Sequence, residues 1–100
     1  MNEEKIIEII YKSISELNNN ELEIKKIPLN RDVILIGSKG CLDSMAFAVF
    51  ISTLERYFFE EINLKIDFLD SIDNPEELFR VLESPQKIAE FIIKISKTSS

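Results

Sequence analysis

Apolar residues recur at helical spacing near the start of the chain. The repeating positions are three or four residues apart, as one face of an α-helix requires: Ile6, Ile10, Ile14 and Leu17, with Ile7 beside them. Asn2 can cap this helix, and Glu3 and Glu4 suit the positive end of the helix dipole. The asparagine triplet at 18–20 is expected to end the first helix.

A second helical pattern follows the pair Asp43-Ser44. Its apolar positions step by four, three and four residues and are joined by two flanking aromatic residues: Phe47, Ile51, Leu54 and Phe58, with Phe50 and Tyr57. Both Asp43 and Ser44 are residue types that cap helices. The pattern therefore predicts a central helix that begins at this pair and buries an aromatic face.

The segment between these two helices contains Pro28, Gly37 and Gly40, which favour an irregular backbone. It spans residues 18–43 and predicts a long loop. Within it, the apolar run at 33–36 is compatible with a short buried strand or with a loop whose side chains enter the core. The pattern alone does not separate these two structures.

Residues 62–68 alternate between apolar and polar, as an extended segment with one buried face does. A third helix is indicated after it, because Asn74 is a good cap, Pro75 suits the first helical position and Glu77 lies three residues after the cap. This short helix is predicted to reach about Leu82.

The pair Ser84-Pro85 repeats the cap-and-proline signal before a final helix. The apolar stripe of that helix has helical spacing: Ile88, Phe91, Ile92 and Ile95. From about residue 97 we expect a disordered polar tail. Together the patterns predict one all-α domain over residues 1–100, with four helices and a long loop between the first and the second.

Composition excludes several kinds of chemistry. The chain has 100 residues and no histidine, so it holds no Ser-His or Cys-His pair and no histidine ligand for zinc. Its single cysteine, Cys41, cannot form an internal disulfide, which suits a reducing compartment. We therefore expect neither a catalytic site nor a metal site.

Charge and hydropathy bear on partners and location. The chain has 12 Lys and Arg against 18 Asp and Glu, a net charge of -6, which argues against binding to nucleic acid. Its apolar runs are far shorter than the about 20 residues of a membrane span, and its acidic N-terminus is unlike a signal peptide. These features favour a cytoplasmic, monomeric protein that does not insert into membranes.

Residues 35–45 read LIGSKGCLDSM and precede a helix with LERYF at 54–58. This stretch resembles the attachment motif of acyl carrier proteins, in which an Asp-Ser-Leu or Asp-Ser-Met triplet follows a glycine-containing loop. The resemblance covers residues 33–68 and extends more loosely to both ends. Residues 88–92, Ile-Ala-Glu-Phe-Ile, are similar to part of the last helix of that family. The resemblance implies an acyl-carrier-like four-helix bundle.

The resemblance also implies that Ser44 receives 4′-phosphopantetheine from coenzyme A and holds an acyl or aminoacyl group as a thioester. Its partners would be a phosphopantetheinyl transferase and the ligases or synthases that load the arm, so the chain itself is not an enzyme. The transferase would recognise Asp43 close to its magnesium ion, and Met45 would lie beside the arm. Physically, a helix N-terminus favours a phosphate group because its N–H groups and dipole attract anions.

Helical geometry places a second set of residues opposite the buried stripe of the central helix: Met45, Val49, Ser52 and Arg56. Between Ser44 and Phe58 only Glu55 and Arg56 are charged, so this face is expected to be apolar, weakly basic and suited to partner binding. The alternative function is a non-catalytic helical adaptor without a prosthetic group, in which Ser44 is only a cap.

Four other motifs are interpreted as structural. Cys41 is expected to be a small apolar loop residue, because no base in the chain can activate it. The glycine-containing loop at 37–40 lacks the Gly-Lys-Ser/Thr ending of a phosphate loop, and the Ser-x-x-Lys string at 84–87 is interpreted as a helix cap. The acidic residues between 67 and 77 lack EF-hand spacing and predict a solvated surface rather than a calcium site.

Overall fold

The structure is a computed structural model that describes residues 2–19, 27–36, 40, 42–72 and 74–98. Five helices are present in these residues: α1 (Glu3–Asn18), α2 (Ser44–Ile62), α3 (Phe68–Ser71), α4 (Pro75–Val81) and α5 (Pro85–Thr98). No strand forms in the part of the chain described. The all-α prediction is confirmed, and the additional helix is the single turn α3, which the sequence analysis did not predict.

Helix α1 begins and ends as its sequence predicts. The side chain of Asn2 accepts a hydrogen bond from the backbone N–H of Glu4 at 2.8 Å and caps the helix. At the other end, Asn18 uses its side-chain amide twice, donating to the carbonyl of Ile27 at 3.0 Å and accepting from the N–H of Ile27 at 2.7 Å. Asn18 therefore also joins the end of α1 to the chain that resumes at Ile27.

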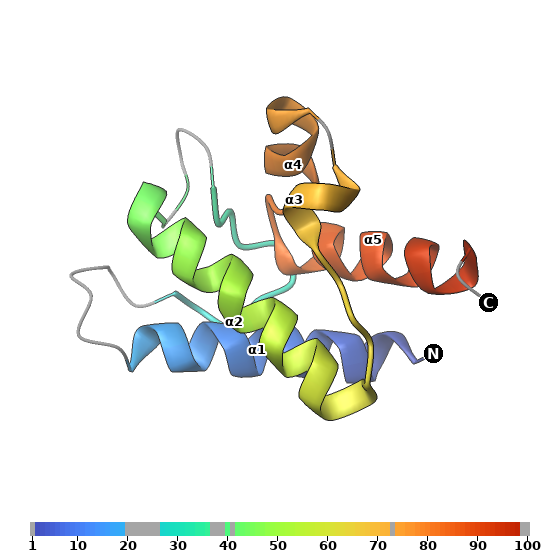
Figure 1. Cartoon of the computed structure of the whole chain (residues 1–100). Coiled ribbons are helices and arrows are strands. Elements are labelled where there is room, and N and C mark those ends of the chain that lie inside the picture. Colours follow the sequence, from blue (N-terminus) through green and yellow to red (C-terminus); the bar gives the residue numbers. More distant parts are fainter. Residues whose placement is uncertain (1, 20–26, 37–39, 41, 73, 99–100) are drawn as a thin grey trace.

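The hydrophobic core lies where α2 and α5 pack against α1 (Figure 1). The predicted stripe of α2 is buried, and Phe50, Leu54 and Phe58 are fully inaccessible to solvent. The isoleucines predicted for the opposing faces of α1 and α5 are buried as well: Ile6, Ile10, Ile14, Ile88 and Ile92. Phe91, which belongs to the predicted apolar stripe of α5, is less buried than predicted. It is only half-buried, because it lies at the edge of the core with its ring centroid 5.9 Å from that of Phe68.

The described part of the segment before α2 is a loop, so the strand considered for residues 33–36 is not formed. Leu35 is completely buried there, and both of its backbone polar groups are bonded. Its N–H donates to the carbonyl of Glu83 at 2.6 Å, and its carbonyl accepts from the N–H of Leu42 at 2.9 Å. Leu35 thus joins the approach to α2 to the turn between α4 and α5.

The chain between α2 and α3 follows an extended path over residues 64–67 (Figure 1) and alternates in exposure as predicted. Asn63 ends α2 in the left-handed region with φ 55°, a conformation that asparagine tolerates better than most residues. A carboxylate oxygen of Glu55 accepts a hydrogen bond from the N–H of Phe68 at 3.0 Å, and the side chain of Asp67 caps α3. The extended segment is therefore held against α2 at the residue where α3 begins.

The last two helices begin at the predicted cap-and-proline pairs. Asn74 accepts a hydrogen bond from the N–H of Glu76 at 2.9 Å, and Ser84 accepts one from the N–H of Lys87 at 3.3 Å. Helix α5 continues to Thr98, so residues 97 and 98 are helical although we had predicted the polar tail from about 97. Residues 99 and 100 lie outside the described part. Among the described helices, none combines the length and the apolar character needed to cross a bilayer.

We expect Phe50→Ala to reduce the free energy of unfolding by about 3–5 kcal/mol, since it removes a fully buried ring and leaves a cavity in the centre of the core. Chemical denaturation monitored by circular dichroism measures this loss. The matched control is Phe59→Ala on the same helix, where the side chain is 54% exposed and the change is expected to be small. Equal stability of the two variants would contradict the assignment of the buried face.

Candidate functional site

Asp43 is the residue that caps α2. Its backbone is extended, and its side-chain Oδ1 accepts a hydrogen bond from the N–H of Ala46 at 2.8 Å. Its carbonyl accepts the N–H of Phe47 at 2.8 Å, the first hydrogen bond of the helix. Sequence had offered Asp43 and Ser44 as equal candidates for the cap. The structure assigns the cap to Asp43 and puts Ser44 at the first helical position, with its side chain outside what the structure describes.

This helix terminus has the polar groups that an anion needs. The N–H groups of the first residues of a helix have no acceptor within the helix. Because Asp43 already bonds to Ala46, the N–H groups of Ser44 and Met45 are the ones left at the outer end of α2. They lie at the positive end of a 19-residue helix. A phosphodiester on Ser44 would therefore be placed at a favourable position.

An apolar rim borders the start of α2. Met45 is 67% exposed, and Phe79 of α4 is 47% exposed. The ring of Phe79 meets that of the buried Phe47 edge to face, with centroids 5.7 Å apart. Sequence analysis predicted Met45 and missed Phe79. The sequence did contain a signal for Phe79. It follows Leu78 directly, so on a helix its side chain is turned about 100° away from that of Leu78, which places an aromatic ring off the core face.

The predicted partner face of α2 contains a hollow of about 390 Å³. Of the predicted residues it brings together Val49, Ser52 and Arg56, and it adds two that the sequence analysis had not singled out, Ala48 and Thr53. Small side chains open this hollow: Ala48 and Ser52 are exposed, whereas the hydroxyl of Thr53 turns back to the carbonyl of Val49 at 2.8 Å. We call these five residues the α2 hollow. Met45 is not among them and is on the side of Ser44.

Two expectations for this face need correction. Val49 was predicted to be exposed, but it is half-buried and packs against the core. Arg56 was predicted to make the face weakly basic, but its guanidinium is bound to both carboxylate oxygens of Glu16 at 2.6 Å and lies 5.0 Å from the centre of the Tyr57 ring. The Glu16 carboxylate raises the pKa of Arg56 further above its ordinary value. The α2 hollow is therefore apolar and hydroxyl-lined, with its cation neutralised by α1.

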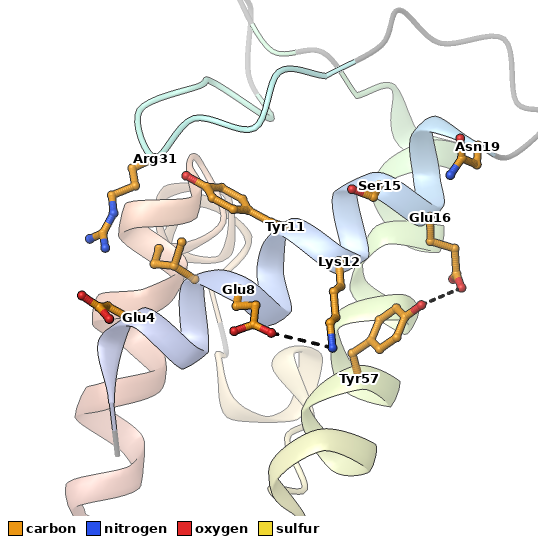
Figure 2. Close-up of a pocket in the computed structure, with 10 residues that line it drawn as sticks. Glu4, Glu8, Tyr11, Lys12, Ser15, Glu16, Asn19, Arg31 and Tyr57 are labelled. Atoms are coloured by element: carbon orange, nitrogen blue, oxygen red, sulfur yellow. Dashed lines mark hydrogen bonds and ion pairs between the residues drawn. The ribbon is translucent and has the colours of Figure 1, made fainter.

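A larger groove of about 730 Å³ follows the exposed side of α1. In Figure 2, Lys12 points toward Glu8, 3.9 Å away, and the Tyr57 hydroxyl points toward Glu16, to which it donates at 3.0 Å. Lys12 also binds Glu61, which raises the pKa of Lys12 and lowers that of Glu61. Lys12 and Glu16 are therefore already occupied by partners within the protein.

The remaining motifs are described only in part. Ser84 caps α5, as the sequence predicted. Cys41 and the loop residues 37–39 lie outside the described part of the chain, as does Asp73 of the acidic segment. Within the described residues, no three cysteine, aspartate or glutamate side chains are grouped so that they could hold a metal ion.

Replacement of Asp43 separates its structural role from recognition by another protein. We expect Asp43→Ala to reduce the free energy of unfolding by about 1 kcal/mol because the N–H of Ala46 loses its acceptor. Asp43→Asn keeps a capping oxygen and should retain nearly the parent stability, as urea denaturation would show. If Asp43→Ala were as stable as the parent, Asp43 would not be the cap.

Comparison with models of known protein families, with curated protein sequences and with solved structures gives no match for this chain. The interpretation of the site therefore depends on its own residues. These are the helix N-terminus at Ser44, the apolar rim of Met45 and Phe79, and the adjoining α2 hollow.

Proposed function

We propose that this protein is a stand-alone acyl carrier protein that holds an acyl or aminoacyl group as a thioester on a 4′-phosphopantetheine arm attached to Ser44. The observation that carries the proposal is the capping of α2 by Asp43. The adaptor alternative explains Ser44 as a helix cap, yet that role is filled by its neighbour. A serine at the first position of the central helix, next to free N–H groups, then fits an attachment site.

The arrangement of helices supports the same proposal. The order of α1, α2, α4 and α5, with a long connection between the first two, is consistent with the four helices of an acyl-carrier-like bundle (Figure 1). The single turn α3 is an addition in the connection that follows α2. The order places the start of α2 beside α4, through the contact between Phe47 and Phe79.

The residues near Ser44 suit a carrier rather than a catalyst. The chain has no histidine, and a carrier needs no base because the transferase and the loading enzymes supply the catalysis. When bound, the arm supplies the thiol that forms the thioester with the cargo. The N–H groups of Ser44 and Met45 would face the phosphate, and Phe79 would present an apolar surface beside the arm.

The first test is phosphopantetheinylation of the recombinant chain. Incubation with coenzyme A and a broad-specificity phosphopantetheinyl transferase is expected to add the mass of one phosphopantetheine group, and Ser44→Ala is expected to abolish the addition. The matched control is Ser15→Ala, a half-buried serine on α1 outside the proposed site, which should be modified like the parent. An unmodified parent, or a modified Ser44→Ala chain, would refute the proposal.

The α2 hollow is the surface on which we propose that the transferase or loading enzyme docks. Burial of Val49 in the hollow, and of Met45 beside Ser44, would supply affinity by removing apolar surface from water. Since Arg56 is already bound to Glu16, ion pairing by that residue would contribute little to recognition. The surface therefore suits an apolar side chain of the partner rather than a strongly acidic one.

We expect Ser52→Glu to impair loading by the cognate partner, because a carboxylate in the α2 hollow must lose its hydration when the partner docks. The fold should be retained, since Ser52 is exposed. Lys65→Glu, an equally exposed position outside the hollow, is the control for added negative charge. Rates of loading measured by mass spectrometry should fall at least tenfold for Ser52→Glu and stay near the parent value for Lys65→Glu; equal rates would remove the hollow from recognition.

A further inference from the structure

Gly40 lies four residues before Ser44, at a point where the backbone of Ile36 passes beside it. A methyl group on Gly40 would lie 2.6 Å from Cα of Ile36 and 2.7 Å from both its backbone nitrogen and its carbonyl carbon. Non-bonded carbon atoms attract each other best at about 3.5–4.0 Å, so these distances are overlaps. Because all three atoms belong to the main chain, no side-chain rotation relieves them. Only a residue without a side chain fits here.

The contact between Gly40 and Ile36 is bracketed by a backbone hydrogen bond. The N–H of Leu42 donates to the carbonyl of Leu35 at 2.9 Å. Leu35 and Leu42 are both buried, and the N–H of Leu35 donates to the carbonyl of Glu83 at 2.6 Å. Both residues of the bracketing bond are therefore anchored in the core. We call the Leu35–Leu42 hydrogen bond and the Gly40–Ile36 contact together the loop closure.

The loop closure ends one residue before the cap of α2. Asp43 follows Leu42 directly, and its side chain caps the helix. The chain that enters α2 is thus held on one side by the bond of Leu42 to Leu35 and on the other side by the cap. A shift of the backbone at Gly40 would be passed through these contacts to Ser44, the first residue of the helix. The fit at Gly40 therefore bears on where the main chain presents Ser44.

We propose that Gly40 is a positioning residue for the modification of Ser44, an inference that rests on the proposed carrier function. In this reaction the serine oxygen forms a bond to the phosphorus atom of coenzyme A that carries pantetheine. The bond from that phosphorus to 3′,5′-adenosine bisphosphate breaks, and the serine proton passes to a base of the transferase. A misplacement of about 1 Å costs such a transfer about a hundredfold in rate. The loop closure holds the main chain of Ser44 in the position from which the transfer occurs.

The test adds one methyl group with Gly40→Ala. The chain must then move away from Ile36, which displaces Leu42 and the start of α2. With coenzyme A and a broad-specificity phosphopantetheinyl transferase, kcat should fall at least about tenfold, because the oxygen of Ser44 is misplaced in the transition state. KM for the chain should stay within about twofold of the parent value, since the α2 hollow is unchanged. Urea denaturation identifies conditions in which every variant is folded.

Two control variants separate this role from a structural one. Ile36→Ala shortens the side chain of Ile36 and keeps the backbone atoms that Gly40 approaches, so it should be modified like the parent. Ile66→Ala removes a buried side chain in the segment after α2, outside the loop closure, and lowers the free energy of unfolding. It should also keep the parent kcat under conditions in which it is folded. Amide chemical shift changes in Gly40→Ala should be concentrated at residues 35–44 and at Glu83.

Four results would overturn the inference: an unchanged kcat in Gly40→Ala, an equal loss in Ile36→Ala, an equal loss in folded Ile66→Ala, or a Gly40→Ala chain that does not fold. The second would assign the effect to a side chain, and the last two would assign it to stability. The experiment also separates this inference from the proposed function. An unmodified parent would refute the carrier function and this inference with it, whereas a modified parent beside an unaffected Gly40→Ala would remove the role of Gly40 alone.

Discussion

Phe50 and Phe58 of α2 are fully buried against the isoleucine faces of the neighbouring helices. An aromatic side chain removes about 150–250 Å² from water, so each such ring contributes far more to stability than an exposed ion pair does. Burial of this face decides how α2 is rotated about its axis. The orientation of Ser52 toward solvent, and the opening of the α2 hollow beside it, follow from that rotation.

The polar contacts around this core fix the relative positions of chain segments more than they add to the free energy of unfolding. Arg31 donates to Glu3 at 2.9 Å and to Gln86 at 3.1 Å, and its carbonyl accepts from the N–H of Gln86 at 3.0 Å. With the backbone bonds of Leu35, these contacts connect the segment before α2 to the starts of α1 and α5. The cap at Asp43 is therefore approached by a chain anchored on both sides of the core, which favours a well-defined N-terminus for α2.

The proposed docking surface on α2 owes its chemistry to a contact with α1. The α2 hollow is apolar and lined by hydroxyls, because Glu16 of α1 neutralises its one cation.

Local signals in the sequence determined most helix boundaries and the buried faces. Asn2, the pair Asn74-Pro75 and the pair Ser84-Pro85 act on N–H groups two or three residues away, so the residues that specify each start are adjacent in the chain. The periodicity of α2 likewise identified its core face. The sequence could not decide whether Asp43 or Ser44 caps α2, because both residue types cap helices and only backbone geometry distinguishes them.

The features that sequence could not determine depend on contacts between distant residues. The turn α3 has four residues, and its first N–H is held by Glu55, thirteen positions earlier in the chain. The charge of Arg56 is neutralised by Glu16 across forty positions, and the exposed ring of Phe79 is placed by Phe47. Leu35 is a loop residue because it bonds to Glu83 rather than to a neighbouring strand. Periodicity and capping report on neighbours within one turn, whereas these pairings exist only after the helices have packed.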